Sequence, residues 1–535
     1  MKDQKLWYKD AIFYQVYVRA FYDSNGDGHG DIKGVTQKLD YLQELGVDCL
    51  WLMPVYPSPL RDDGYDIADY YNIAKTFGTL DDFTELLNAA HARDIRIIMD
   101  LVLNHTSDEH PWFQAARADR NSPYRNYYVW SDTEQKYNDA RIVFVDTEPS
   151  NWTWDEKAGQ YFWHRFYASQ PDLNYDNPKV QDEMLRVAEF WLERGIDGFR
   201  ADAVPYLFER EGTNCENLPE THVYLKKIRA FIDSKYPDRI LLCEANQWPQ
   251  DVRPYFGDGD EFHMGFHFPI MPRIYMALKK GRAEDMIEIL NRTPEIPENC
   301  QWCIFLRNHD ELTLEMVTPE ERDWMWEQYA PDARMKLNLG IRRRLAPLLD
   351  NDRRKIELAH SLLFTLPGSP ILYYGDEIGM GDNIWLEDRN GVRTPMQWDA
   401  SPTAGFSPAP VDSLYSAIIE DENYSPERVN VRAQRANPDS LWNAIRRMIA
   451  VRREHRVFGR GDFAWIDFHN PHIAAFQRRY DGESVIAIHN LSDSSQDISS
   501  EMKKSANTLT DLITNKSLDL EDLQLAPYQF LWLKA

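Results

Sequence analysis

The chain of 535 residues has few cysteines, and they argue against a disulfide framework. Only five are present, an odd number, and Cys49 and Cys243 lie inside apolar runs typical of buried strands. Cys300 and Cys303 form a C-x-x-C pair, but no second pair or histidine cluster accompanies it. We therefore predict ordinary core thiols rather than a zinc or redox site.

Basic residues are also in short supply. Lysine and arginine total 60 against 86 aspartates and glutamates, so the formal net charge is −26. Such a chain repels phosphates, so neither nucleic acid nor an anionic membrane surface is expected as a partner. Hydrophobic residues at 43% and charged residues at 27% lie in the globular range, which excludes a disordered or fibrous protein.

The chain lacks a long hydrophobic run. Its most apolar segment, residues 361–375, is interrupted by two prolines and a glycine within residues 367–370, well short of the roughly 20 residues that a spanning helix needs. Near the N-terminus, Gln15 and Arg19 interrupt the only apolar stretch, so no secretory signal peptide is predicted. We expect a cytoplasmic protein.

Eight short apolar runs recur along the chain, mostly separated by amphipathic helical stretches such as residues 180–195 and 221–235. This alternation is typical of parallel β/α architecture, and eight repeats predict an α/β fold, a closed (β/α)8 TIM barrel. The predicted strands cover residues 12–18, 47–53, 95–102, 198–202, 240–245, 262–268, 303–309 and 371–377.

Two intervals are too long to be ordinary loops of a compact barrel. Residues 105–175, rich in Trp, Tyr, Asn and Asp, are predicted to form an inserted subdomain B after the third strand, over the C-terminal mouth. Residues 312–350 are predicted to form a helical insertion after the seventh strand. From residue 459 only strand patterns occur, so residues 459–535 should form a C-terminal antiparallel β-sandwich domain. The catalytic barrel then comprises residues 1–104 and 176–458.

Polar clusters end four of the predicted strands, at residues 100–107, 198–204, 241–247 and 305–311. In a (β/α)8 barrel, catalytic groups come from the C-terminal ends of several strands. A purely structural barrel would not need carboxylates at three such ends, because an unpaired charge there costs desolvation free energy. We therefore predict a catalytic site.

Asp202 and Glu244, at the ends of adjacent predicted strands, suit the chemistry of a retaining glycosidase. That chemistry needs a nucleophilic carboxylate and an acid/base carboxyl about 5 to 5.5 Å apart. Arg200 shares a strand face with Asp202 and would keep it ionised at neutral pH. Apolar neighbours and the Asp202 charge should raise the pKa of Glu244. A structural ion pair of Arg200 with Asp202 is the alternative.

Taken together, the four clusters resemble the characteristic regions of the α-amylase family of retaining glycosidases and transglycosidases, over essentially the whole chain. Residues 170–174, QPDLN, resemble a marker of the branch containing oligo-1,6-glucosidases, sucrose isomerases and trehalose synthases. Residues 307–317, RNHDELTLEMV, and the insertion after them are most similar to the trehalose synthases (maltose α-D-glucosyltransferases). This resemblance implies an isomerase, an intramolecular transglucosidase that interconverts maltose (α-1,4) and trehalose (α-1,1) by retaining double displacement with some hydrolysis to glucose.

The resemblance also assigns roles to the residues of the barrel mouth. It makes Asp202 the nucleophile and Glu244 the acid/base. It makes Asp310 the third catalytic carboxylate, which with His309 holds the sugar 2- and 3-hydroxyls, and it implies that His105 contacts the 6-hydroxyl.

Further residues are expected to shape the two sugar sites. The resemblance implies that Asp62 and Tyr65 close the non-reducing end of the glucose pocket, with Arg389 paired to Asp62. Asn246 and Glu311 are candidates for contacts to the second glucose from their position alone. The predicted substrate-binding residues are therefore Asp62, Tyr65, His105, Arg200, Asn246, His309, Glu311 and Arg389.

Residues 23–31, DSNGDGHGD, predict a divalent-cation loop. Oxygen ligands occupy positions one, three, five and nine with Gly28 at six, as in calcium loops, although position twelve is Gly34 instead of Glu. The loop resembles the cation loop of oligo-1,6-glucosidases. Calcium is expected, with magnesium as the alternative. The predicted ligands are Asp23, Asn25, Asp27, Asp31 and the His29 carbonyl.

A second calcium site, joining the inserted subdomain to the barrel, is implied by the resemblance to trehalose synthases. Both cations are expected to be structural, and no organic cofactor is predicted. The implied ligands are Asn104, Asp172, Glu209 and the carbonyls of Tyr206 and Leu207.

Two alternative functions fit parts of the same sequence. A hydrolytic α-glucosidase or oligo-1,6-glucosidase would use the same carboxylates in a wetter pocket. A non-catalytic carbohydrate-binding or transporter-associated barrel is the alternative from another class, and the presence of all three carboxylates counts against it. The chain has no phosphate-binding loop for a nucleotide, so any maltose kinase would be a separate protein. That partner, activity on sucrose and a homo-oligomer are left open.

Overall fold

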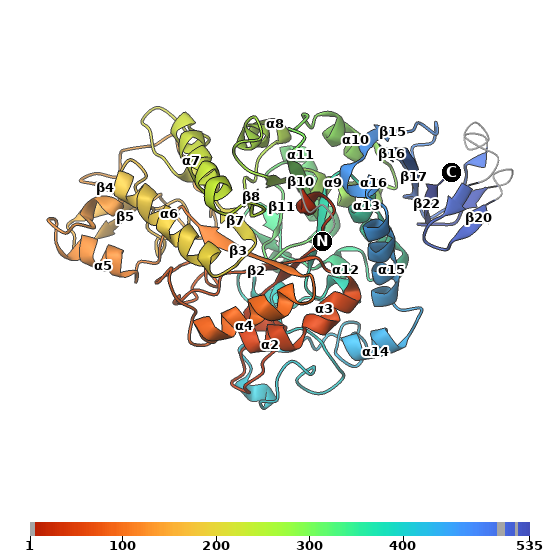
Figure 1. Cartoon of the computed structure of the whole chain (residues 1–535), viewed down its shortest axis with the longest axis horizontal. Helices are drawn as coiled ribbons and strands as arrows, with labels where there is room; N and C mark the ends of the chain where they lie inside the picture. The colour runs from red at the N-terminus through yellow and green to blue at the C-terminus, as the bar shows by residue number, and fades with distance from the viewer. Residues whose placement is uncertain (1–5, 500–508, 519–522, 535) are drawn as a thin grey trace.

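The computed structural model describes residues 6–499, 509–518 and 523–534, and its centre is a closed barrel of eight parallel strands (Figure 1). The order around the barrel is β1, β14, β10, β9, β8, β7, β3, β2. The predicted (β/α)8 fold is confirmed, because each predicted run overlaps one strand. These strands are β1 (Phe13–Val16), β2 (Cys49–Leu52), β3 (Arg96–Val102), β7 (Gly198–Asp202), β8 (Ile240–Cys243), β9 (Met264–Phe266), β10 (Gln301–Phe305) and β14 (Ser369–Tyr373).

Helices surround the barrel, and their sequences explain where they begin. In α6 (Pro178–Glu193) the Asn177 side chain accepts a hydrogen bond from the Lys179 N–H, and proline fills the first turn, where its missing N–H costs nothing. The buried residues of α6 are all apolar, as a helix with one apolar face requires. The other helices of six residues or more outside the two insertions are α2 (Ile32–Gln37), α3 (Leu39–Leu45), α4 (Leu80–His91), α7 (Pro219–Lys235), α9 (Ile270–Lys280), α10 (Glu284–Asn291), α13 (Arg353–Thr365), α14 (Val431–Ala436) and α15 (Leu441–Glu454).

Shorter helical turns connect these elements. The four-residue helices are α1 (Val18–Phe21), α8 (Pro249–Val252), α12 (Leu345–Leu348) and α16 (Val457–Arg460). The 3₁₀ turns are η1 (Trp7–Lys9), η2 (Arg125–Tyr127), η3 (Val204–Tyr206), η4 (Arg253–Phe256), η5 (Ala333–Met335), η6 (Asp376–Ile378), η7 (Asn390–Val392) and η8 (Val411–Ser413).

The interval 105–175 leaves the barrel after β3 and has secondary structure of its own, at the left of Figure 1. It contains α5 (Pro111–Ala118) and an antiparallel sheet in the order β4 (Trp130–Ser131), β6 (Gln160–Trp163), β5 (Trp152–Asp155). An isolated bridge pairs His105 with Asp172, so the segment leaves and returns at neighbouring points. Its exact domain boundaries stay predictions.

The interval 312–350 is only partly helical, so the prediction of a helical insertion was incomplete. It contains α11 (Pro319–Tyr329), which begins with a capping box between Thr318 and Glu321. It also contains a small antiparallel sheet of β11 (Leu312–Thr313), β13 (Gly340–Ile341) and β12 (Lys336–Leu337). Two-residue strands are too short to show a period in the sequence.

An antiparallel domain follows the barrel, as predicted, at the right of Figure 1. Asp481 and Gly482 join β16 to β17 with positive φ angles of 49° and 79°, as a tight hairpin turn requires. The outer domain limits predicted at residues 1 and 535 lie outside the described residues. The six-stranded sheet has the order β15 (Asp462–Trp465), β16 (Ile473–Tyr480), β17 (Glu483–Asn490), β22 (Phe530–Lys534), β19 (Leu509–Asp511), β20 (Lys516–Leu518), beside a two-stranded sheet of β18 (Gln496–Asp497) and β21 (Gln524–Leu525).

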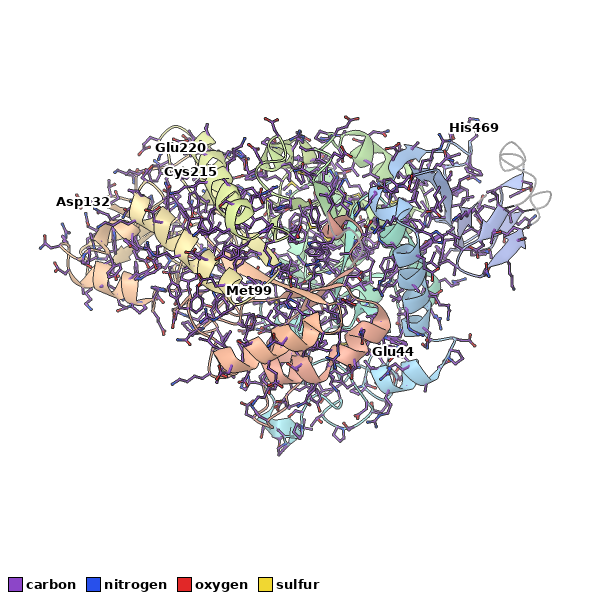
Figure 2. All side chains as sticks on the ribbon, in the orientation of Figure 1. Glu44, Met99, Asp132, Cys215, Glu220 and His469 are labelled. Atoms are coloured by element: carbon purple, nitrogen blue, oxygen red, sulfur yellow. The ribbon has the colours of Figure 1, made fainter. Side chains whose placement is uncertain are left out.

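The cysteines are free and buried, which agrees with the prediction of core thiols. Figure 2 marks Cys215 beside α7 and Met99, a fully buried residue, on β3. Within the described part of the chain, no helix is both long enough and apolar enough to cross a bilayer.

Candidate active site

The two predicted catalytic carboxyl groups lie on neighbouring strands at the same rim of the barrel. Asp202 ends β7, and Glu244 directly follows β8. The strand register pairs Ala201 with Cys243, and the Glu244 N–H donates to the Ala201 carbonyl at 3.1 Å. The Ala203 N–H in turn donates to Glu244 Oε2 at 3.3 Å. Parallel pairing therefore brings both carboxyls to the C-terminal face.

A single buried arginine, Arg200, contacts three carboxylates beneath this rim. Its Nη1 lies 2.5 Å from Asp202 Oδ1 and 2.6 Å from Asp100 Oδ1, and its Nη2 lies 2.5 Å from Glu244 Oε1. Trp51 Nε1 donates to the other Asp100 oxygen at 2.9 Å. Asp100 was not predicted as a site residue. The signal that could have found it was a carboxylate inside the buried run of β3, where an unpaired charge is costly.

Burial sets the protonation of this pair. Burial raises the pKa of Asp202. The charge of Arg200 lowers that pKa, and the charge of Asp100 raises it further. Burial also raises the pKa of Glu244, again opposed by Arg200, and the charges of Asp202 and Asp310 add to the increase. Glu244 therefore keeps its proton to a higher pH than an exposed glutamate does.

A second buried arginine, Arg389, holds the opposite side. Its Nη2 lies 2.6 Å from Asp62 Oδ1, so the predicted pair is present in the structure, and its Nη1 lies 2.8 Å from Asp310 Oδ1. Asp388 contacts its Nε at 3.1 Å. Burial alone would raise the pKa of Asp310, but its contact with His309 and the charges of Arg389 and Arg393 outweigh it and hold that pKa below its usual range.

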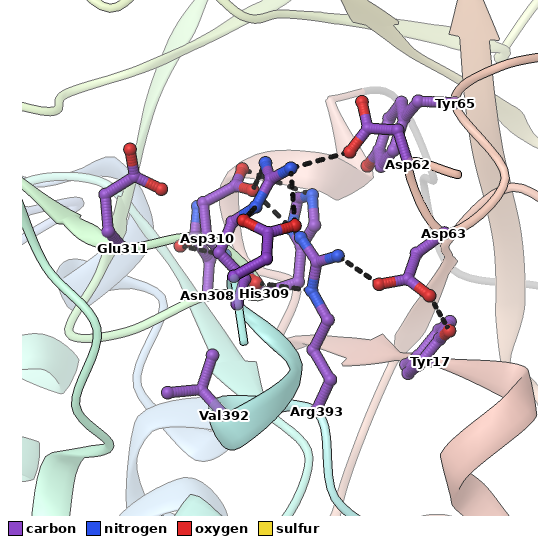
Figure 3. A network of polar contacts seen from close by, with 12 residues as sticks. Tyr17, Asp62, Asp63, Tyr65, Asn308, His309, Asp310, Glu311, Val392 and Arg393 are labelled. Atoms are coloured by element: carbon purple, nitrogen blue, oxygen red, sulfur yellow. Dashed lines mark hydrogen bonds and ion pairs between the residues drawn. The ribbon is translucent and has the colours of Figure 1, made fainter. Parts of the chain in front are cut away.

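Arg393 supports this side from below and was not predicted as a site residue. Its Nε donates to the His309 carbonyl at 2.8 Å, and its Nη2 lies 3.1 Å from Asp310 Oδ1. It also pairs with Asp63, which accepts a hydrogen bond from the Tyr17 hydroxyl at 2.6 Å (Figure 3). Two arginines therefore fix the position of the Asp310 carboxylate.

The carboxyl groups of Asp202, Glu244 and Asp310 line one pocket of about 130 Å³. The Tyr65 ring stacks on His309 with centroids 5.3 Å apart. His105 Nε2 is buried without a hydrogen-bond partner among the described residues, and its pKa is lowered by burial to about 3, so its ring is neutral. The predicted residues that line the pocket are Asp62, Tyr65, His105, Asp202, Glu244, Asn246, His309, Asp310, Glu311 and Arg389, with Arg200 behind them.

The two candidates for the second glucose lie on the same side of the pocket. Asn246 donates through Nδ2 to Thr313 Oγ1 at 3.0 Å, and its Oδ1 has no partner among the described residues. Glu311 accepts from Asn338 Nδ2 at 3.2 Å, and burial raises its pKa. The pocket also contains side chains from the two insertions that were not predicted, and the aromatic richness of residues 105–175 was the available signal. These are Val143, Phe144, Phe166, Thr313, Glu315 and Asn338.

The first predicted cation loop is held together by its own hydrogen bonds. Asp23 accepts from the N–H groups of Asn25, Gly26 and Gly28, and Asp31 accepts from Ser24 and Gly34. The side chains at positions 25 and 27 are exposed. Across the described ranges, no group of three or more His, Cys, Asp or Glu side chains is placed to hold a metal ion.

The second predicted set fits a cation better. Asn104 Oδ1, Asp172 Oδ2 and Glu209 Oε1 are all buried without a hydrogen-bond partner among the described residues. Glu209 lies close to Asp172, since burial and then the Asp172 charge raise the pKa of Glu209. Several unsatisfied oxygens in one buried place are the donor set that calcium prefers.

Comparison with known proteins agrees with this geometry. Residues 15–335 and 338–461 match the family described as Alpha amylase, catalytic domain, and residues 463–532 match Maltogenic Amylase, C-terminal domain.

Individual relatives agree. "Trehalose synthase/amylase TreS" of Mycobacterium tuberculosis (strain CDC 1551 / Oshkosh) is 59% identical over 94% of this chain and 84% of its own length. "Trehalose synthase" of Pimelobacter sp. (strain R48) is 57% identical over 93% and 89%. The crystal structure of the trehalulose synthase MutB from Pseudomonas mesoacidophila MX-45 superposes with a TM-score of 0.79 at 28% identity, over 99% of both chains. The chain therefore belongs to the α-amylase family of enzymes.

Proposed function

We propose that this enzyme interconverts maltose and trehalose by intramolecular glucosyl transfer with net retention. The observation that carries the proposal is the pairing of Asp202 and Glu244 through Arg200 at one rim of a small pocket. Relatives named trehalose synthase, 55–60% identical over most of the chain, support the choice of substrate.

The first step breaks the glycosidic bond of maltose. Asp202 attacks the anomeric carbon of the non-reducing glucose, and Glu244 transfers its proton to the glycosidic oxygen, so glucose leaves. In the second step, Glu244 takes the proton from the anomeric hydroxyl of the released glucose. The anomeric oxygen of this glucose then attacks the glucosyl ester and releases Asp202, which gives the α-1,1 linkage. Transfer to water in place of glucose gives hydrolysis.

The opposite side of the pocket is suited to hold the glucosyl unit. Asp310, kept ionised by its cationic neighbours, accepts hydrogen bonds from the 2- and 3-hydroxyls beside His309, and His105 Nε2 is free to meet the 6-hydroxyl. Asp62 and Arg389 close the end, so only one terminal glucose fits beyond the scissile bond. Asn246 and Glu311 are left to position the second glucose.

Isomerisation requires that the released glucose is retained and water excluded. Two contacts join the segments over the pocket. Arg141 Nη1 lies 2.9 Å from Glu315 Oε2, and the Asn338 N–H donates to Asp146 at 2.7 Å. The pocket is below the roughly 300 Å³ at which ligand pockets usually begin. We infer that these segments separate to admit the disaccharide and then close on it.

Calcium at Asn104, Asp172, Glu209 and the carbonyls of the 206–207 turn would tie the inserted segment to the barrel, a structural role. The loop of residues 23–31 is proposed as a second structural cation site, with calcium or magnesium. A cytoplasmic location, a homo-oligomer, a maltose kinase partner and action on sucrose stay open predictions.

The test is proton NMR of the purified enzyme with maltose, following anomeric signals over time. Trehalose as main product, abolished in Asp202→Ala, is the expected result. Glucose as the sole product would replace the isomerase with a hydrolytic α-glucosidase. Unaltered maltose would mean that the enzyme acts on another linkage.

A further inference from the structure

A second cavity adjoins the catalytic pocket and has no place in the proposed reaction. It measures about 370 Å³, which lies in the range of about 300 to 1,000 Å³ that small-molecule sites occupy. Asn246 and Glu315 line both cavities, so they form a shared wall. Arg141 lines the second cavity and donates to the hydroxyl of Tyr206, which lines the first, at 3.1 Å.

The wall of this side cavity carries a buried amide whose hydrogen bonds are not satisfied. Gln247 is 7% exposed, and its Oε1 has no hydrogen-bond partner among the described residues. Its Nε2 reaches only Glu216, at a long 3.4 Å. The neighbouring Asn246 Oδ1 is unpartnered in the same part of the structure. Buried amides are expensive to leave in this state, so both atoms call for a ligand that donates hydrogen bonds.

The rest of the wall fits a polyhydroxylated ring better than an ion. Glu216 is held by Arg141 at 2.8 Å and by the buried Arg165 at 2.9 Å, so its charge is already balanced. Trp248 also lines the cavity beside the polar groups, and the guanidinium groups of Arg292 and Arg273 lie over its ring, 4.7 and 5.3 Å from the centroid. Amide, carboxylate and arginine side chains around an aromatic ring offer both acceptors and donors to hydroxyls and an apolar surface to C–H groups.

We propose that the side cavity binds a free hexopyranose, glucose in the first instance, at a site separate from the catalytic pocket. Gln247 accepts from a sugar hydroxyl, and the ring lies beside Trp248. Binding there requires no turnover, so the inference does not depend on which disaccharide the enzyme transforms. Because the two cavities share a wall, an occupied side cavity also holds Asn246 and Glu315 in place.

The test is calorimetric titration of the full chain with glucose, in a crossed set of variants. Wild type should show two sites. Asp62→Ala should lose the glucose site in the catalytic pocket. Gln247→Met, which keeps the volume and removes the amide, should raise the dissociation constant of glucose about tenfold in the side cavity only. Gln181→Met is the control, since this half-buried glutamine on α6 lines neither cavity and should leave both sites unchanged.

Two results would overturn the proposal. One is a single site in wild type that Asp62→Ala removes, which would leave the side cavity to water. The other is a second site that is unaffected by both Gln247→Met and Trp248→Leu. Thermal unfolding of each variant shows whether it is folded, and the second substitution tests the cavity from its aromatic side if the first proves unstable. If the side cavity binds no glucose, the proposed conversion of maltose, which is measured separately by NMR, is not affected.

Discussion

On each of two sides of the catalytic pocket, one buried arginine contacts three carboxylates, but the pKa of the key carboxyl group shifts in opposite directions. On one side Arg200, on strand β7, contacts Asp100, Asp202 and Glu244. On the other side, Arg389, in the segment after β14, contacts three aspartates, among them Asp310. Each arginine is buried and each contacts three carboxylates, yet burial prevails at Glu244, whose pKa is raised, and the arginines prevail at Asp310, whose pKa is lowered.

The difference lies in the number of cations per carboxylate. Arg200 alone faces three carboxyl groups, so the group next to the scissile bond, Glu244, keeps a proton. Asp310 is contacted by two arginines, Arg389 and Arg393, so it keeps its charge. A retaining glycosidase needs both states side by side, a proton donor and a fixed anion facing the developing positive charge. Counting cations around each carboxylate therefore explains its role.

The largest effect is expected from Arg200→Lys. A single ammonium group cannot reproduce the planar fork that reaches three carboxylates, so the buried carboxylates lose part of their compensation and their alignment. We expect kcat to fall by at least about 100-fold, measured with maltose under saturating conditions. The conservative change Lys227→Arg, on the exposed face of α7, should leave kcat unaltered. A variant at position 200 with near-normal kcat would show that this side does not depend on the fork.

A smaller effect is expected from Arg389→Lys on the other side. The substitution removes one of the two charge-assisted contacts to Asp62 and Asp310, and each contributes about 1.5 to 3 kcal/mol. We expect kcat/KM to fall about 10- to 100-fold, with most of the change in KM, because the glucosyl unit is held less well. Loss of kcat with KM unchanged would contradict a binding role for this arginine.

The pH dependence should separate the two sides further. Activity needs ionised Asp202 and protonated Glu244, and both pKa values are raised, so activity is lost as pH falls through the first and as pH rises through the second. Asp100→Asn removes a charge that raises the pKa of Asp202, so the acid limb of kcat/KM should move to lower pH. Asp388→Asn, on the opposite side, is the control. An acid limb that moves equally in both variants would remove Asp100 from this account.

The smallest effect on chemistry is expected from removing divalent cations. Chelation should lower the melting temperature by several degrees, because the unsatisfied oxygens of Asn104, Asp172 and Glu209 would lose their partner. Activity well below that temperature should persist. Differential scanning calorimetry with and without chelator checks this, and Asp172→Asn should reduce the shift. Lost activity at an unchanged melting temperature would place a cation at the reacting atoms instead.

Some of the fold and the site could be predicted because the signals are local. Eight apolar runs predicted eight barrel strands, since buried parallel strands leave continuous apolar stretches. The strand ends then indicated Asp202 and Glu244. In contrast, Arg393 is separated by 83 residues from Asp310, and the sheet of β11 to β13 is built from two-residue strands. No local pattern marks contacts of that kind.

The sequence by itself determined the barrel, the antiparallel C-terminal domain and the residue types at the strand ends, because these depend on periodicity and on short-range order along the chain. The tertiary structure alone decided how many cations surround each carboxylate, which oxygens are left unsatisfied, and that a second cavity shares the wall of Asn246 and Glu315. Those properties arise where distant segments meet, and electrostatic effects depend on distance and burial, which no linear spacing specifies.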